Sequence, residues 1–309
     1  MSVATDFTEY FQFHSVGAAV VFSVIYIILF GWFVRQSMKN MTYVYVALTV
    51  FCLLRLVGFL LRAIVIANKS LHTNENPFVA AEVLFGVGFF ALLYSAFTLV
   101  LDRWSHELFP SFSVNIVRRE LMSTGLDDDD AGLHVFTAPS VSFPSKLLHN
   151  RRLFRALLIV AVALTISGIL NSLSNDAGTA AVGNDLRRAA TVLFLVLTVV
   201  QAAQTVVVST KENAGSYHNP HPKRIGDRHA PTILILISLL MLTREIFLTA
   251  TMQNSTRQNQ ESLWYPFVAL PEVLAVACYA ISGLVPARKE LKMREEALKG
   301  QMAGMEMRA

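Results

Sequence analysis

Six ionisable side chains lie inside segments that are otherwise apolar enough to cross a membrane. Arginines can hold an anionic group of a substrate, and carboxylates can exchange protons with it. Each such charge costs roughly 2.5 to 3.5 kcal/mol at the centre of a membrane helix, so the six must face a bundle interior and meet partners there. These candidate binding residues are Arg55, Arg62, Glu82, Arg244, Glu245 and Glu272.

The composition places these charges in a membrane protein. Of 309 residues, 54% are hydrophobic and 16% are charged, and the mean hydropathy is +0.48, which does not suit an ordinary soluble domain. The net charge of +4 comes from loops beside the apolar segments, which argues against nucleic acid as a partner. The lipid bilayer is therefore the expected environment.

Seven apolar windows have the length of about 20 residues that a helix needs to cross the hydrocarbon layer. They predict an all-α fold, a seven-transmembrane helix bundle over residues 15–285. The windows are 15–34, 42–67, 78–101, 153–173, 187–209, 230–252 and 264–285.

Lysines and arginines outside the windows or at their ends indicate the orientation. One set of alternating segments holds 19 of them, and the other holds only four, namely Lys69, Arg187, Arg188 and Arg257. Because cytoplasmic loops carry the excess of positive charge, the N-terminus (residues 1–14) is predicted to be extracellular and the C-terminus cytoplasmic.

Two sequons agree with this orientation. Asn68-Lys69-Ser70 and Asn254-Ser255-Thr256 both fall in segments that the charge rule places outside, which makes Asn68 and Asn254 candidate glycosylation sites. Glycosylation would place the protein in the plasma membrane or in an endomembrane of the secretory pathway.

Two segments are predicted to be cytoplasmic. The loop 102–152 carries four consecutive aspartates from Asp127 to Asp130 and is expected to be partly disordered, with a role as a candidate contact for a cytoplasmic partner. In the tail 286–309, Leu291 and Leu298 share a helical stripe with two methionines. The tail is predicted to be an amphipathic helix on the inner leaflet or, alternatively, a solvated basic segment.

An internal repeat surrounds the charges. The segment from Pro77 to Leu84 matches the segment from Pro266 to Leu274, with one residue inserted in the second. Arg55 precedes Pro77 by 22 positions, and Arg244 precedes Pro266 by the same 22. The spacing predicts a parallel repeat of three helices, a linking helix and three more, unless it is a coincidence of apolar composition.

Depth below the outer boundary predicts which charges pair. Arg244 and Glu272 each lie eight residues, or about 12 Å, from the outer ends of their windows, so they are expected to meet. By the same measure Arg62 is predicted to pair with Glu82. Arg55 remains near mid-membrane, where Glu245 is its expected counter-ion. Structurally, such pairs can also simply lock helices together.

The other motifs in the sequence argue against a retinal pigment and against a membrane enzyme. Asp102-Arg103-Trp104 stands where rhodopsin-like receptors carry Asp-Arg-Tyr, but the Asn-Pro-x-x-Tyr motif of those receptors is missing from the last window. Window 264–285 has no lysine for a retinal Schiff base. His218, His221 and His229 are too few for a membrane desaturase site. We therefore expect no catalytic residue, no metal and no cofactor.

Short motifs are spread over most of the chain except the long loop, namely Phe51 to Arg55 with Gly58, then Arg244-Glu245, Glu272, Tyr279 and Gly283. They resemble a poorly characterised family of fungal seven-span membrane proteins. The late arginine, and the glutamate followed by tyrosine, are more distantly similar to the fungal RTA-like lipid-translocating exporters, although the aromatic-rich early signature of those exporters is lacking. That resemblance implies export of a lipid or another amphiphile.

The charges and the topology together favour a transporter or translocator. Its substrate would be a small or amphiphilic molecule with an anionic group, held by the arginines while the carboxylates exchange protons. The alternatives are a seven-transmembrane receptor, in which the same charges bind a ligand or form an activation lock, and a structural membrane scaffold.

Overall fold

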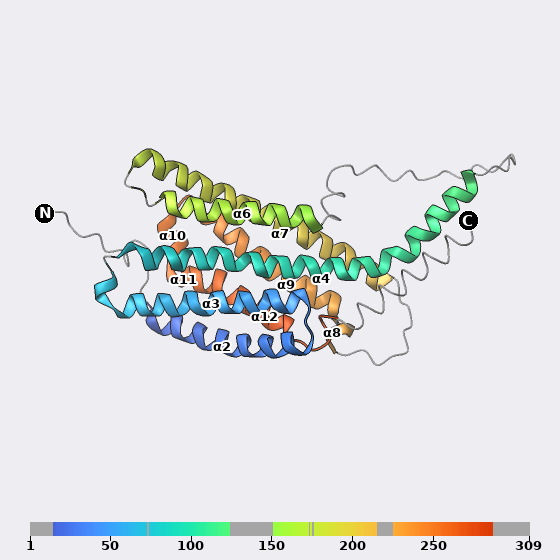
Figure 1. Cartoon of the computed structure of the whole chain (residues 1–309), viewed down its shortest axis with the longest axis horizontal. Coiled ribbons are helices and arrows are strands. Elements are labelled where there is room, and N and C mark those ends of the chain that lie inside the picture. The colour runs from blue at the N-terminus through green and yellow to red at the C-terminus, as the bar shows by residue number, and fades with distance from the viewer. Residues whose placement is uncertain are drawn as a thin grey trace.

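A computed structural model describes residues 15–72, 74–123, 151–172, 174, 176–214 and 225–286. Within these residues, seven helices are long and apolar enough to cross a membrane, and they lie side by side in an all-α bundle (Figure 1). The predicted fold class is therefore confirmed. The protein is an integral multi-pass membrane protein, and its orientation stays a prediction.

The helices that cross the bundle alternate in direction along the chain. The first six are α2 (Val16–Lys39), α3 (Tyr43–Ala67), α4 (Glu75–Ser123), α6 (Arg151–Ser172), α7 (Ala177–Ala214) and α9 (Ala230–Thr251). The seventh crossing, Glu261–Tyr279, is built from α11 (Glu261–Trp264), the π-helix η2 (Tyr265–Ala269) and α12 (Leu270–Tyr279). Short helices lie at the ends of the bundle: η1 (Lys69–Leu71), α8 (Ile225–Arg228) and α10 (Ser255–Asn259).

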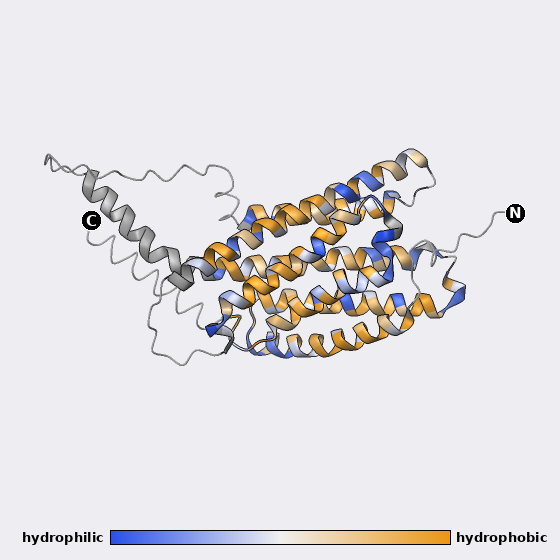
Figure 2. Ribbon diagram, turned by 180° about the vertical axis from the view of Figure 1, so that it is seen from behind, coloured by the Kyte–Doolittle hydropathy of each residue, from blue (hydrophilic) through white to orange (hydrophobic). Residues whose placement is uncertain are grey.

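Helix α4 forms the centre of the bundle. It contacts α3, α6, α7 and α9, and 67% of its apolar window is buried, against 22% for α2. Helix α2 packs mainly on α3 and presents Val21 and Ile28 outward, where lipid would solvate them. The ribbons are hydrophobic along most of their length and hydrophilic towards their ends, as expected for membrane helices (Figure 2).

Small residues allow two helices to approach closely at the predicted outer end. A Cβ on Gly168 of α6 would lie 2.7 Å from Cγ of Arg187, and a Cβ on Gly183 of α7 would overlap the main chain at Ser172. Glycine at these two positions therefore lets α6 and the start of α7 pack backbone to backbone. This contact fixes the face of α7 that carries Arg187.

Helix boundaries differ from the predicted windows in three places. Helix α7 begins at Ala177, ten residues before the predicted 187, because polar residues continue the helix beyond the apolar window. Helix α4 continues to Ser123, although its candidate membrane span ends at Asp102, where the long loop is predicted to begin. The last crossing ends at Tyr279 rather than 285, and a turn with Gly283 at φ 95° follows. Residues 124–150 and 287–309 lie outside the described part, and with them the remaining loop and tail predictions.

Candidate functional site

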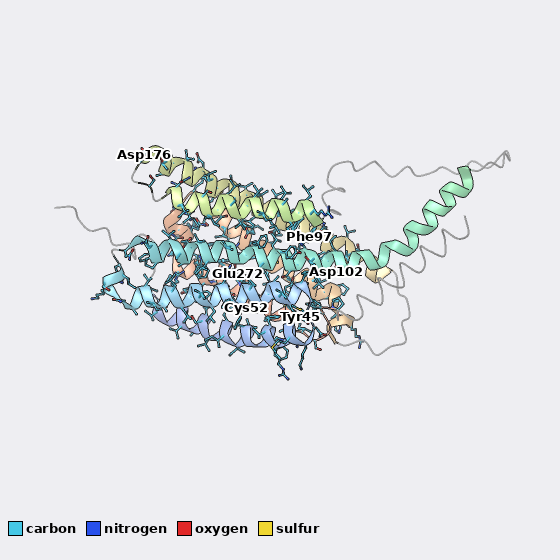
Figure 3. The ribbon with its side chains drawn as sticks, in the orientation of Figure 1. Tyr45, Cys52, Phe97, Asp102, Asp176 and Glu272 are labelled. Atoms are coloured by element: carbon cyan, nitrogen blue, oxygen red, sulfur yellow. The ribbon has the colours of Figure 1, made fainter. Side chains whose placement is uncertain are left out.

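Four of the six candidate residues meet in the interior of the bundle. We call Arg55 of α3, Arg244 and Glu245 of α9, and Glu272 of α12 the charge cluster. Its side chains are between 0% and 7% exposed, and two positive charges face two negative ones. Glu272 lies well inside the bundle, between the ends marked by Asp176 and Asp102 (Figure 3).

A single carboxylate oxygen joins the two arginines. Glu272 Oε1 accepts a hydrogen bond of 2.6 Å from Nη2 of Arg55 and another of 2.6 Å from Nε of Arg244. Arg244 also donates through Nη1 to Glu245 Oε1. Charge-assisted bonds of this kind are the strongest hydrogen bonds in proteins, so Glu272 ties α3, α9 and α12 together.

Helix α4 supplies the remaining support for the arginines. Nη1 of Arg55 donates to the main-chain oxygen of Phe85 at 2.7 Å, and the guanidinium lies 5.1 Å from the Phe85 ring centre. A Cβ on Gly88 would lie only 3.0 Å from that same Nη1, so glycine makes the room that the guanidinium occupies. Arg244 lies over the ring of Phe89 at 3.9 Å, a cation–π contact.

The π-helix η2 explains how Glu272 reaches both arginines. Glu272 follows Pro266 by six positions, whereas Glu82 follows Pro77 by five. The amide of Leu270 bonds to the oxygen of Tyr265, five residues back, so one extra residue is accommodated in this turn. In a regular α-helix one extra residue would rotate Glu272 by about 100° about the helix axis. The π-turn absorbs that residue, and Glu272 faces both Arg55 and Arg244.

Arg62 and Glu82, the two candidate residues outside the charge cluster, do not pair with each other as predicted. Arg62 pairs with Glu261 at 2.9 Å rather than with Glu82, so that prediction is wrong. Glu261 begins α11 ahead of the predicted window and also accepts a bond from the Ser15 amide at 2.7 Å. Glu82 lies 4.0 Å from Arg187, and both are partly exposed.

The predicted partners of the charge cluster are half right. The pair of Arg244 with Glu272 is confirmed. The expected pair of Arg55 with Glu245 is wrong, because Glu272 is turned towards Arg55 and Arg244 occupies Glu245.

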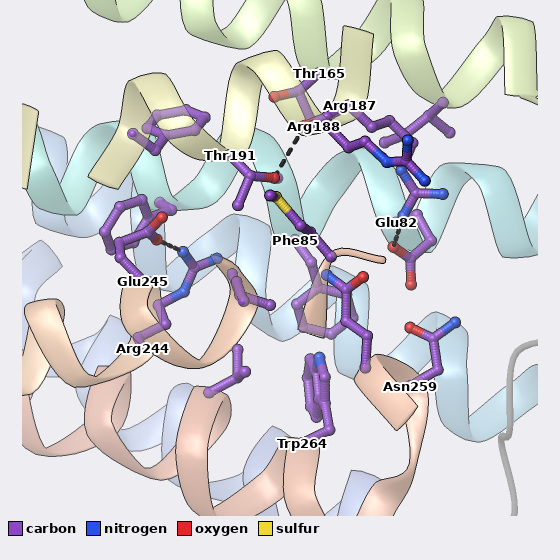
Figure 4. A pocket seen from close by; sticks show the side chains of 18 of the residues that line it. Glu82, Phe85, Thr165, Arg187, Arg188, Thr191, Arg244, Glu245, Asn259 and Trp264 are labelled. Atoms are coloured by element: carbon purple, nitrogen blue, oxygen red, sulfur yellow. Dashed lines mark hydrogen bonds and ion pairs between the residues drawn. The ribbon is translucent and has the colours of Figure 1, made fainter. Parts of the chain in front are cut away.

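A pocket of about 260 Å³ opens above the charge cluster. Arg55, Arg244 and Glu245 line its buried floor, whereas exposed residues such as Asn184 and Arg188 line its mouth. Figure 4 shows Arg244 with Glu245 on one side and Arg187 with Glu82 on the other. Other lining residues are polar (Thr165, Thr191, Gln253, Gln258, Asn259), aromatic (Phe85, Phe89, Phe194, Trp264) or small and aliphatic (Gly86, Ile169, Leu248, Met252, Val268).

The lining of the pocket itself is electropositive. Four arginines and two glutamates line it, so the positive charges exceed the negative ones by two. Two carboxylates behind the lining, Glu272 beside Arg55 and the exposed Asp185 beside Arg188, balance this excess. In a membrane interior such charges act over longer distances than in water, because the dielectric constant is low. The pocket is therefore suited to a small anion, with hydrogen-bond donors and aromatic faces to orient it.

Sequence reasoning missed two residues of the pocket. Arg187 and Arg188 were counted as charges at the edge of a window, but they belong to the body of α7. The signal was the spacing of Arg187, Thr191 and Phe194, which places all three on one helix face. All three line the pocket.

The two sequon asparagines lie at the end of the bundle that holds the pocket mouth. Asn68 is exposed and accepts bonds from the amide and the hydroxyl of Ser70. Asn254 is also exposed and accepts a bond from the Arg257 amide at 3.0 Å. Glycosylation at these sites stays a prediction.

The chain matches no protein-family model, no curated protein and no solved structure. The resemblance to fungal seven-span proteins therefore remains an expectation from the sequence, and the functional argument depends on the geometry of the site.

Proposed function

We propose that the protein is a membrane transporter that takes a small organic anion into the pocket above the charge cluster. The observation that carries this proposal is the depth of the pocket. It leads from exposed residues at its mouth to Arg55 and Arg244, which are at most 6% exposed. Arginines at such depth are costly and are typical of substrate paths.

Arg244 gives the site a means of responding to its substrate. Its guanidinium is shared between Glu245, which lines the pocket, and Glu272, which lies behind it. A substrate carboxylate or phosphate that reaches Arg244 competes with Glu245 for the same donor. The released Glu245 then takes up a proton, because an unpaired carboxylate is unstable at this depth. Anion entry and proton uptake are coupled in this way.

The size of the pocket restricts the substrate. Its volume of about 260 Å³ is below the 300 to 1,000 Å³ that is usual for sites of drug-sized ligands. A small organic acid fits inside it whole. An amphiphile would place only its anionic head group there, with its chains in the surrounding bilayer. Cations are disfavoured by the positive lining.

Binding is tested with three probes: inorganic phosphate, succinate and a short-chain phosphatidic acid. The purified full chain is heated with each probe, and the wild type should be stabilised by about 1.4 kcal/mol when the probe is at ten times its Kd. Arg244→Gln should remove the stabilisation. Arg257→Gln is the matched control, because Arg257 is exposed on α10 and does not line the pocket. Equal stabilisation of all three proteins would contradict the proposal.

Uptake separates a transporter from a receptor. Reconstituted vesicles should accumulate the probe that binds, and Glu272→Gln should abolish this flux. Binding without any uptake would instead favour a seven-helix receptor with the same pocket. We place the protein in the plasma membrane or the secretory pathway, because the asparagines of both sequons, Asn68 and Asn254, are exposed.

A further inference from the structure

A second polar region lies between α7 and α9, on the side of the charge cluster away from the pocket mouth. We call it the polar seam. Its side chains are hydroxyls and amides, each at most 3% exposed, in a bundle whose other contacts at this level are largely apolar. The polar seam consists of Thr198, Gln201, Gln204, Thr205 and Ser209 of α7 and Ser238 of α9.

The hydrogen bonds within the polar seam leave the amide oxygen of Gln201 without a donor. Gln201 Nε2 donates to Thr205 Oγ1 at 2.9 Å and to Ser238 Oγ at 3.1 Å. Both hydroxyls donate to main-chain oxygens of their own helices, at 3.0 and 2.9 Å. Gln201 Oε1 is buried and has no donor among the residues that the structure describes.

Turning the amide of Gln201 over does not remove the deficit. Thr205 donates to a main-chain oxygen, and Ser238 has a main-chain oxygen and Thr205 Oγ1 as acceptors, so Oε1 would gain a donor only if one of these bonds were lost. A buried acceptor without a partner costs about 1 to 3 kcal/mol. A water molecule removes this cost, because a polar site of this kind offers it several partners.

The polar seam begins one to two helical turns below the floor of the pocket, with the apolar Met241 between Ser238 and Glu245 on α9. Phe194 lines the pocket, and Thr198 follows it one turn further along α7. On α9, Glu245 lines the pocket and Ser238 lies seven residues, or two turns, away on the same face. At its far end, Ser209 donates to the main-chain oxygen of Pro231, near the start of α9. The polar seam thus extends from below the charge cluster to the opposite end of the bundle.

We infer that the polar seam binds water and is the path by which protons pass between Glu245 and the end of the bundle opposite the pocket. A proton leaves the Glu245 carboxyl group as hydronium, and Glu245 returns as a carboxylate to Arg244. The side chains of the polar seam are joined directly at 2.9 to 3.1 Å, which excludes an organic anion, so water enters beside Gln201 Oε1, where the described part of the chain provides no donor. The inference rests on the proposed function, which assigns proton exchange to Glu245.

Hydration is tested without any substrate, by cysteine labelling in reconstituted vesicles. Cys52 and Cys278 are first replaced by alanine, and Ser238→Cys is compared with Leu239→Cys. Leu239 is the neighbouring residue on α9 but is 55% exposed towards the membrane. A small methanethiosulfonate reacts with the thiolate, which forms only in contact with water, so Ser238→Cys should react about ten times faster or more. Equal or slower reaction of Ser238→Cys would overturn the inference.

Gln201→Leu tests proton conduction. This variant should retain stabilisation by the probe that binds the pocket but lose the proton uptake that accompanies anion entry, measured with a pH dye inside the vesicles. If it does not fold, Thr205→Val serves the same purpose with less change in volume. Unchanged proton uptake, or loss of anion binding as well, would overturn the inference. If no probe binds the wild type, the proposed function fails, while cysteine labelling still decides whether the polar seam holds water.

Discussion

Replacing Glu272 by glutamine removes one charge from a site where two arginines depend on it. Both bonds to Glu272 Oε1 measure 2.6 Å, and the side chain is 3% exposed, so the charge cluster would change from neutral to a net charge of +1. Removing one partner of a buried ion pair costs 3 to 5 kcal/mol, and glutamine retains an oxygen that can accept. We therefore expect a loss of about 3 kcal/mol in the free energy of unfolding.

Glu82→Gln is the matched control for this substitution. Glu82 lies 4.0 Å from Arg187, and its side chain is 23% exposed, so the loss should stay below about 1 kcal/mol. Both variants are unfolded with dodecyl sulfate in mixed micelles, and far-UV circular dichroism reports the helix content. Equal losses for the two variants would refute the reasoning. The reasoning would also be refuted if Glu272→Gln lowered the free energy of unfolding by only about 0.6 kcal/mol, the average for ordinary interhelical hydrogen bonds in a membrane.

Three further predictions concern single positions. Gly88→Ala should lower the free energy of unfolding by about 1 to 3 kcal/mol, because its Cβ meets Arg55 of the charge cluster. Gly17→Ala is the control: a Cβ there meets nothing within 4 Å, so this variant should raise the free energy of unfolding by up to about 1 kcal/mol in the same assay. The hydroxyl and then the amide of Thr179 hold the pKa of Asp176 below its ordinary value. This cap of α7 is complete above the ordinary pKa of aspartate and is lost as the pH falls through the lowered one, which amide exchange at Thr179 should show. Replacing both sequon asparagines by glutamine should abolish a mass decrease that the wild type shows on treatment with a glycosidase.

The sequence predicted the helices well because their signal is local. Each apolar window is long and nearly free of charge, and a helix covers most of every one of the seven. The meeting of Arg244 with Glu272 was also predictable, since both lie at the same depth in windows whose outer ends were nearly right.

The other partners depended on features that hydropathy does not report. The π-turn in η2 directs Glu272 so that one carboxylate serves both arginines, whereas pairing by depth left Arg55 with the remaining carboxylate, Glu245. Glu261 lies before the last apolar window, so it was never considered as a partner for Arg62. Arg187 was missed as a pocket residue for the same reason, because polar residues extend α7 beyond its apolar window. These errors all arise where a helix continues beyond, or departs from, its apolar stretch.

The bond between Arg55 and Glu272 also has a consequence for synthesis of the chain. The two residues are 217 positions apart, so at 5 to 20 residues per second a ribosome needs roughly 10 to 40 s to proceed from one to the other. During that time the helix of Arg55 must stay in the membrane without its carboxylate. The main-chain oxygen of Phe85, only 30 positions later, is made within the first few seconds of this interval. It can hold the guanidinium until the last helix arrives.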